Sequence, residues 1–155
     1  MSNCSGTFTQ KISDFENKLA SAKSSFTENI IPSEPFFSSY YGYKMRLLIS
    51  LDLGRIGFTG YMGVYIMLMR SDHDGMLPWP FKETLAFSVI DQQDDKQCRI
   101  DDVKVLDPEG EVQFQRPQQD QNEGFSCPTF ISHSKLRTRK YIKDNTVYVQ
   151  VQIQQ

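Results

Sequence analysis

The sequence lacks most of the features that mark membrane, secreted and zinc-binding proteins. No apolar run approaches the roughly 20 residues that a membrane-spanning helix needs. The three cysteines, Cys4, Cys98 and Cys127, are an odd number without CxxC spacing. That pattern argues against a disulfide framework and against a zinc ribbon. We therefore expect reduced cysteines, no membrane insertion and a cytoplasmic location.

An excess of charge of one sign is also missing. The formal net charge of −2 over 155 residues gives no overall field to attract nucleic acid or anionic lipid. A basic run near the C-terminus lacks interleaved aromatics of the kind that stack on bases. It comprises Lys135, Arg137, Arg139, Lys140 and Lys143. The sequence predicts that this run is a solvated helix face and that nucleic acid is not a partner.

Catalytic and metal-binding motifs are absent as well. The chain contains no GxSxG, HExxH, P-loop or GxGxxG pattern, and its only histidines are His73 and His133. The adjacent residues Asp72, His73 and Asp74 cannot all face one ion without unusual backbone geometry. We therefore predict an exposed turn there, a packing role for His133, and a domain that is not an enzyme and binds no cofactor.

What the sequence does contain is alternation of apolar and polar residues with period two. Apolar residues occupy the odd positions of Tyr43–Leu51, and the segments Leu85–Val89 and Val147–Ile153 alternate in the same way. This alternation predicts half-buried strands. The segment Tyr61–Met69 is apolar on both parities, which predicts a strand covered on both faces.

Shorter segments complete the predicted fold. Short strands are expected near Gly6–Ile12 and Cys127–Ser132, and a loop over the part of the glutamine-rich stretch Gln113–Asn122 that follows Pro117. One short helix is expected after a cap at Ser13 or Asp14, and another over Ser134–Tyr141. Many short strands with few helices predict an all-β sandwich. Its predicted core contains Leu47, Ile49, Val64, Ile66, Leu85, Phe87, Val149 and Val151.

Several short sequence motifs occur along the chain in a fixed order. They are Pro35-Phe36-Phe37, Tyr41-Gly42-Tyr43-Lys44-Met45, Pro78-Trp79-Pro80-Phe81, Asp91-Gln92, Phe114-Gln115-Arg116-Pro117, Gly124-Phe125-Ser126-Cys127-Pro128 and Tyr141-Ile142-Lys143-Asp144-Asn145. Together they closely resemble the C-terminal (TRAF-C, or MATH) domain of the TNF-receptor-associated factors. The resemblance implies one domain over residues 1–155, with a core at about 6–153. It also implies an eight-stranded antiparallel β-sandwich with one or two short helices.

The same resemblance implies an adaptor function. Members of the family are cytoplasmic signalling adaptors that bind short peptide motifs in receptor tails or other signalling proteins. The full-length proteins are homotrimers through an upstream coiled coil, which we expect to be absent from this chain together with any RING or zinc fingers. We therefore expect the chain to be a monomer or a weak trimer. The alternatives are a MATH domain that recruits substrates to a ubiquitin ligase or deubiquitinase, and a structural domain with a degenerate groove.

The resemblance also places a peptide groove on the sequence. In the family the peptide adds as an extra strand beside an edge strand, which corresponds to Gly124–Cys127 here. The residues that match the groove are Leu48, Ser50, Tyr65, Val112, Phe114, Gly124, Phe125, Ser126 and Cys127.

Two departures from the family pattern affect the expected ligand. Leu48 and Ser50 stand where several members have an arginine and an aromatic or histidine, and the loop Glu109–Gln113 has no serine where some members have several. We therefore expect a hydrophobic or aromatic peptide anchor and little dependence of binding on salt. The alternatives are that Leu48 packs against a neighbouring loop and that Phe125 fills the core or the sheet edge, in which case neither contacts a ligand.

Overall fold

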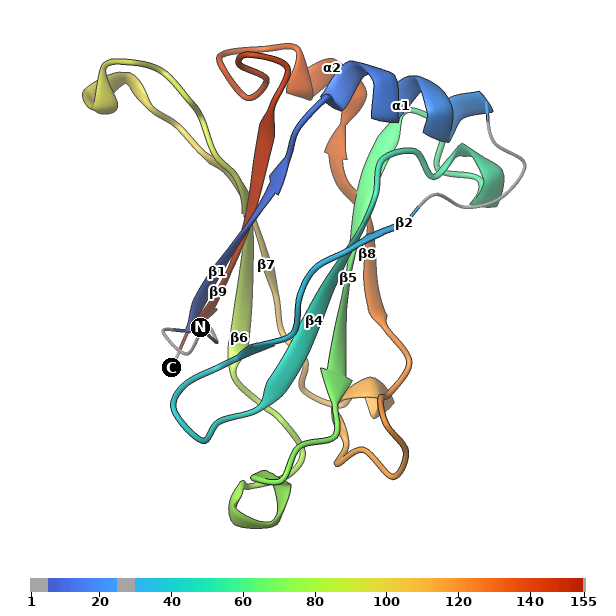
Figure 1. The fold of residues 1–155 in the computed structure, drawn as a ribbon, viewed down its shortest axis with the longest axis vertical. Helices are drawn as coiled ribbons and strands as arrows, with labels where there is room; N and C mark the ends of the chain where they lie inside the picture. The colour runs from blue at the N-terminus through green and yellow to red at the C-terminus, as the bar shows by residue number, and fades with distance from the viewer. Residues whose placement is uncertain (1–5, 25–29, 155) are drawn as a thin grey trace.

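The computed structural model describes residues 6–24 and 30–154, which form two antiparallel sheets packed face to face (Figure 1). The four-stranded sheet has the order β1-β9-β6-β7, with bounds Thr7–Ile12, Val147–Gln154, Thr84–Val89 and Asp102–Leu106. The five-stranded sheet has the order β2-β4-β5-β8, with bounds Ile30–Pro32, Lys44–Ser50, Tyr61–Met69 and Phe125–Ser132. A short β3, Phe36–Phe37, also pairs with β4.

Two helices lie at one end of this sandwich (Figure 1). They are α1, Phe15–Ser24, and α2, His133–Leu136; single 3-10 turns lie at 54–56, 74–76, 96–98 and 112–114. None of the helices in the described part of the chain is long and apolar enough to cross a membrane. The prediction of a mostly β sandwich with two short helices is confirmed.

The core between the sheets agrees with the sequence. All eight residues that we predicted to face inward are buried, none of them more than 1% exposed. Their alternation along β4, β6 and β9 places them on the inner faces, because successive side chains of a strand point to opposite faces. The predicted register of the sandwich is therefore confirmed.

Three features of the strands differ from the prediction. The second face of β5 is half-buried at Tyr65, Met67 and Met69 rather than fully covered. Within 6–24 and 30–154 the structure has nine strand segments rather than eight, and the additional pairing of β3 spans only two residues. The sequence did not reveal β2, β3 or β7, because two of them are very short and β7 is largely exposed.

The start of α1 is held by a residue distant in the sequence. Glu16 N donates to Asn145 Oδ1 at 2.9 Å, and Phe15 N donates to Asn145 O at 2.9 Å. Asp14 O accepts from Lys18 N, but the Asp14 carboxylate bonds the amides of Asn17 and Asn145 rather than a helix N–H. The predicted cap at Ser13 or Asp14 is therefore wrong, since Asn145 in the turn before β9 supplies it.

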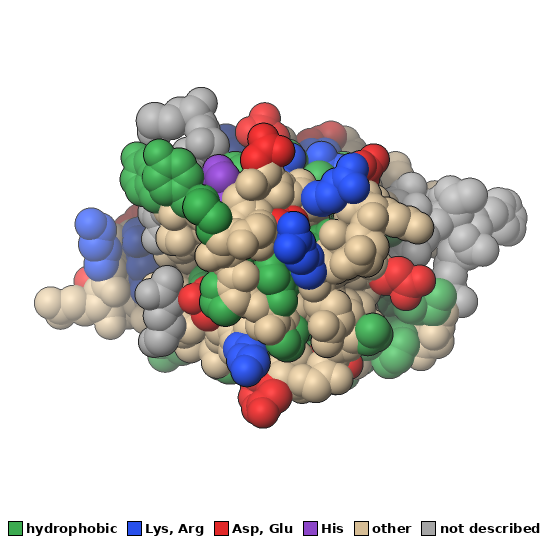
Figure 2. All heavy atoms as spheres, turned by 90° about the horizontal axis from the view of Figure 1, so that it is seen from below, with side chains coloured by type: hydrophobic (Ala, Val, Ile, Leu, Met, Phe, Trp, Pro, Cys, Tyr) green, Lys and Arg blue, Asp and Glu red, His purple; other side chains and the backbone are tan. Residues whose placement is uncertain are grey.

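Aromatic side chains pack together at the opposite end of the sandwich, where Tyr43 contacts both Trp79 and Phe81. Figure 2 views the molecule from this end. Trp79 packs edge-on against Tyr43 at 5.0 Å, and its Nε1 donates to Asp74 O at 2.9 Å. His73 is not in a fully solvated turn, because its ring lies 5.2 Å from that of Tyr41 and 5.6 Å from that of Phe37. Asp74 is buried and its Oδ2 accepts from Ser71 N, so this turn is more ordered than we expected.

Candidate functional site

Strand β8 lies at the edge of the five-stranded sheet. It pairs with β5 along one side, and no other strand of the described residues pairs with it. An edge strand presents unpaired N–H and C=O groups that another extended chain can bond. The predicted segment Gly124–Cys127 falls at the start of this edge strand.

Three of the predicted residues lie in one row across the sheet. Leu48 of β4 is opposite Tyr65 of β5, which is opposite Ser126 of β8. Leu48 and Tyr65 are half-buried and Ser126 is exposed, so the row lies on the outer face of the sheet. Residues 17 to 78 positions apart in the sequence thus form one continuous surface that leads from β4 to the open edge.

Phe125 and Cys127 flank Ser126 and point to the other side of β8, because side chains alternate along a strand. Both are half-buried and pack against the core, and burial raises the pKa of the Cys127 thiol. Cys127 and Cys98 are free thiols, as we expected, whereas Cys4 lies outside the described residues. The edge strand is therefore anchored by its inward side chains.

Phe114 belongs to the support of this edge rather than to its surface. Its ring lies 5.3 Å from that of Phe125 and 5.7 Å from that of Phe81, and it is only 1% exposed. The prediction that Phe114 is a wall of the pocket is corrected, since a fully buried ring cannot touch a ligand without a rearrangement. It holds Phe125 in place instead.

Ser50, Val112 and Gly124 complete the predicted set. Ser50 is 0% exposed and pairs with Ile30 and Gly63. Contrary to our prediction, it therefore does not contribute to the outer surface. Val112 is 74% exposed in the 3-10 turn before Phe114. A Cβ at Gly124 would lie 3.3 Å from Tyr65 Cβ, so glycine lets the chain enter β8 close to that side chain.

One residue on this surface was missed. Arg46 lies on β4 two residues before Leu48, and is opposite Met67 of β5. It is half-buried, and its Nε is a buried donor without a hydrogen-bond partner in the described part of the chain. Its even position in β4, the same parity as that of Leu48, could have identified it from the sequence.

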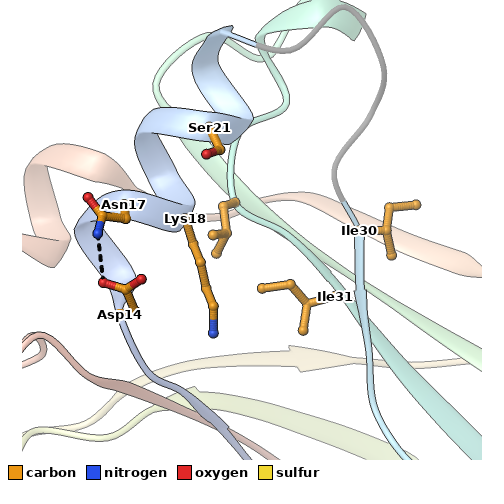
Figure 3. A pocket seen from close by; sticks show the side chains of 7 residues that line it. Asp14, Asn17, Lys18, Ser21, Ile30 and Ile31 are labelled. Atoms are coloured by element: carbon orange, nitrogen blue, oxygen red, sulfur yellow. Dashed lines mark hydrogen bonds between the residues drawn. The ribbon is translucent and has the colours of Figure 1, made fainter.

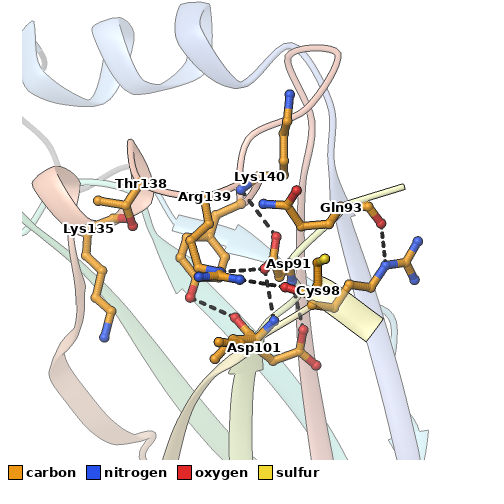
Figure 4. Close-up of polar contacts among 11 residues, drawn as sticks. Asp91, Gln93, Cys98, Asp101, Lys135, Thr138, Arg139 and Lys140 are labelled. Atoms are coloured by element: carbon orange, nitrogen blue, oxygen red, sulfur yellow. Dashed lines mark hydrogen bonds and ion pairs between the residues drawn. The ribbon is translucent and has the colours of Figure 1, made fainter. Parts of the chain in front are cut away.

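A second polar cluster surrounds the buried Asp91, whose carboxylate is hydrogen-bonded within the fold (Figure 4). Its carboxylate accepts from Arg139 Nε at 2.7 Å, Ile100 N at 2.9 Å and Lys140 N at 3.2 Å. Burial alone would raise the pKa of Asp91, but these bonds outweigh it and the pKa lies below its ordinary value of 3.8. The cluster therefore ties the chain after β6 to the segment after α2 and offers nothing to a ligand.

The basic run after β8 is mostly paired with acids rather than solvated. Four of its residues form ion pairs, namely Lys135 with Asp102, Arg137 with Glu16, Arg139 with Asp91 and Lys143 with Asp94. The predicted helix over Ser134–Tyr141 ends at Leu136, so the run is not a helix face. Four of the five cations of the run are therefore engaged in ion pairs within the fold.

Two further features lie away from the surface around β8. A hollow of about 390 Å³ lies between α1 and β2, lined by Asp14, Lys18 and Ile31 among others (Figure 3), at the sheet edge opposite β8. His133 Nε2 lies 2.7 Å from Leu51 O, which confirms its packing role. Among residues 6–24 and 30–154, no group of histidine, cysteine and carboxylate side chains could hold a metal ion.

Comparison with known proteins identifies relatives of the whole described fold. The family model "TRAF/meprin, MATH domain" matches residues 28–150. Human TNF receptor-associated factor 1 is 31% identical over 147 residues, which is 93% of this chain and 34% of that protein. Mouse TNF receptor-associated factor 5 is 31% identical over 151 residues, 96% of this chain and 26% of that protein. The solved structure of Notothenia coriiceps TRAF5 aligns with a TM-score of 0.84 and 31% identity, covering 97% of this chain and 73% of that one. The chain spans about a third or less of the length of these curated relatives.

Proposed function

Because the chain belongs to the TRAF/meprin MATH domain family, we propose that it is an intracellular adaptor domain that binds short linear peptides at the open edge of β8. The peptide adds as a further strand of the five-stranded sheet, in the recognition mode called β-augmentation. The partners are cytoplasmic tails of receptors or other signalling proteins. Membership of the family agrees with the expectation that the domain is not an enzyme.

The observation that carries this proposal is the position of β8. Main-chain groups on its open side can bond an extended peptide of any sequence, which supplies affinity without specificity. The row of Leu48, Tyr65 and Ser126 lies beside that edge and can select among peptides through side-chain contacts. Leu48 and Tyr65 are only half-buried, so they present apolar area that an extra strand would cover.

A role in recruiting substrates to a ubiquitin ligase or deubiquitinase uses the same edge and differs in the rest of the protein. The relatives described above are TNF receptor-associated factors, which favours the receptor adaptor. In that role the affinity of a single domain is low, and several linked domains bind a clustered receptor by avidity. The trimer of the full-length protein is part of this proposal.

The proposal is tested by selection of peptides from a random phage-displayed library on the folded chain, followed by NMR mapping. We expect extended peptides without a fixed backbone turn. On addition of a selected peptide, backbone amide signals of Gly124–Cys127 and their neighbours in β5 should shift most. Selection of no peptide, or shifts confined to the hollow between α1 and β2, would contradict the proposal.

A further inference from the structure

The hollow between α1 and β2 lies outside the surface that the proposed function uses. It lies at the edge of the five-stranded sheet opposite β8, where β2 pairs with β4 and with no other described strand. Its volume of about 390 Å³ falls within the range of small-molecule pockets in proteins. At the roughly 30 Å³ that a water molecule occupies in the liquid, it has room for about a dozen non-hydrogen atoms. The hollow therefore fits a small ligand.

The floor of the hollow is apolar and continuous with the core. Ile31 of β2 is opposite the fully buried Ile49 of β4 and therefore lies on the inner side of the sheet. Leu51 follows β4 and is only 2% exposed, whereas Ile31 is half-buried and Ile30 is 39% exposed at the rim. Apolar surface thus faces water between α1 and β2. Covering this surface with an aliphatic chain is favourable, because it removes apolar area from water.

Lys18 brings a positive charge to this apolar floor. Figure 3 shows its side chain extending from α1 into the space beside Ile31 of β2. Lys18 forms no ion pair with any described residue, whereas Lys135 and Lys143 each pair with an acid. Ser21 lies about one turn further along α1 and adds a hydroxyl group to the lining. An ammonium and a hydroxyl group both donate hydrogen bonds, so they favour an anionic group on the ligand.

Asp14 also lines the hollow, and its negative charge limits where an anion can bind. Its Oδ1 accepts from Asn17 Nδ2 at 3.0 Å and from Asn145 Nδ2 at 3.3 Å. Figure 3 shows this side chain bonded to Asn17 rather than to Lys18. The amides therefore hold the Asp14 carboxylate, and the Lys18 ammonium has no acidic partner among the described residues. An anion binds on the Lys18 side of the hollow.

We propose that this hollow binds a medium-chain fatty acid in its carboxylate form. The carboxylate accepts hydrogen bonds from Lys18 Nζ and the Ser21 hydroxyl, and the aliphatic chain covers Ile30, Ile31 and Leu51. Octanoate, with about ten non-hydrogen atoms, matches the volume of the hollow. Since Lys18 and Ser21 are exposed, binding is weak, with a Kd of roughly 1 mM for a ligand of this size. The site is independent of the peptide edge at β8.

The test is an NMR titration of the folded chain with octanoate below the concentration at which it forms micelles. Backbone amide signals of α1, Ile30, Ile31 and Leu51 should shift, and those of Gly124–Cys127 should not. Hexanoate should bind several-fold more weakly, because each fully buried methylene tightens binding about fourfold. Octanol, which lacks the charge, and acetate, which lacks the chain, should each bind more weakly than octanoate. Absence of shifts around the hollow, or equal shifts with acetate and octanoate, would overturn the proposal.

Substitutions on the exposed side of α1 separate the contribution of the charge from that of the chain. Lys18→Gln should raise the Kd of octanoate about threefold, a typical effect of losing an exposed ion pair, and should leave the Kd of octanol unchanged. Ser21→Tyr should fill the hollow and abolish binding of both ligands. Lys23→Gln is the matched control, because Lys23 lies in the last turn of the same helix, outside the lining and near Glu16. It should bind octanoate like the wild type.

Two outcomes of these measurements would contradict a fatty-acid site. One is an octanoate affinity that Lys18→Gln leaves unchanged, or that Lys23→Gln lowers equally. The other is tighter binding at the hollow of a peptide with a free C-terminal leucine than of octanoate, with loss on amidation of that terminus, because the ligand would then be a protein C-terminus. Both outcomes leave the proposed function standing, since peptide binding at β8 is measured from the signals of Gly124–Cys127.

Discussion

Phe125 shows how one side chain can serve both the fold and the site. Its ring contacts the buried ring of Phe114 at 5.3 Å, and it remains half-buried at the start of the edge strand. The ring therefore stiffens the backbone that a peptide would pair with, and its exposed part is available for contact. Both roles depend on the ring, whereas the main-chain bonds of β8 do not.

Replacement of this ring should weaken peptide binding. We expect Phe125→Ala to raise the Kd of a selected peptide about tenfold, because truncation of an aromatic anchor in an interface typically costs 1 kcal/mol or more. Phe125→Leu should recover most of the loss, since it retains apolar volume. The measurement is isothermal titration calorimetry on variants shown by circular dichroism to be folded.

The control for that experiment is Lys135→Ala. Lys135 lies in α2 and pairs with Asp102 of β7, away from the start of β8. It should leave peptide affinity unchanged. Equal affinities of the wild type and Phe125→Ala would show that the ring is only a core plug, which was the alternative interpretation of its sequence position.

The buried Asp91 predicts how the stability of the fold depends on pH. Its carboxylate is fully buried and accepts bonds from Arg139, Ile100 and Lys140, and its pKa in the folded state is below 3.8. Folding lowers the pKa of Asp91, so the charged carboxylate stabilises the folded state at neutral pH. This stabilisation is lost as the pH falls below about 4 and through the folded-state pKa.

We expect Asp91→Asn to lower the free energy of unfolding by roughly 2–3 kcal/mol at pH 7, since bonds to a charged acceptor are worth about 1.5–3 kcal/mol. The difference between the two proteins should shrink as the pH is lowered below 4, because the carboxylate is protonated first in the unfolded chain and then, at lower pH, in the folded protein. Urea unfolding at several pH values measures both. A difference that stays constant from pH 7 to the acid limit would contradict this assignment.

At the scale of elements, the sequence predicts those strands whose two faces differ. The alternation in β4, β6 and β9 identified both the strands and their buried residues, because the inner face of a sandwich must be apolar. Strand β7 could not be found in this way, since Val103 and Val105 are exposed on an edge strand. A pattern of burial cannot reveal a strand that is barely buried.

Long-range contacts between elements are a second limit of sequence reasoning. The start of α1 looked as if Ser13 or Asp14 would cap it, but the bonds come from Asn145, 129 residues away from Glu16. Nothing local in either segment signals that they meet. Asp144 and Asn145 lie in a tight turn before β9, with φ values of 52° and 56°.

This cap can be isolated by two substitutions. Asn145→Gly keeps the left-handed backbone but removes the side-chain oxygen, so it should cost about 1 kcal/mol of stability, the usual value of an N-cap. Asn145→Ala also strains the positive φ and should cost roughly 1 kcal/mol more than the glycine variant. Thermal and urea unfolding give both values. Equal stabilities of the glycine variant and the wild type would contradict the capping role.

At the scale of the whole molecule, the candidate site can be predicted only in part from the sequence. The resemblance placed the edge strand correctly, and the strand register brings Leu48, Tyr65 and Ser126 together. Burial of Ser50 and Phe114 could not be seen, because it depends on what packs over each residue. The unpaired state of Arg46 was hidden for the same reason, since it is a property of all its neighbours.

Assembly is the next prediction at this scale. We expect the 155-residue chain to be a monomer or only a weak trimer at micromolar concentration in light scattering, because it contains no heptad pattern of a coiled coil. Fusion of a trimeric coiled coil before the chain should raise the apparent affinity for a surface dense in peptide by at least tenfold, without changing the affinity for one free peptide. A tight trimer of the unfused chain would contradict this expectation.

The central claim is that a peptide pairs with β8 as an extra strand, and N-methylation of the peptide backbone tests it most directly. A strand bonded along one side uses the N–H groups of alternate residues. A selected peptide carrying one N-methyl group at each position in turn should therefore lose binding at every second residue within the segment facing Gly124–Cys127, and tolerate the groups between. Uniform tolerance along the peptide, or losses without this alternation, would show that side chains alone hold the peptide and would contradict β-augmentation at this edge.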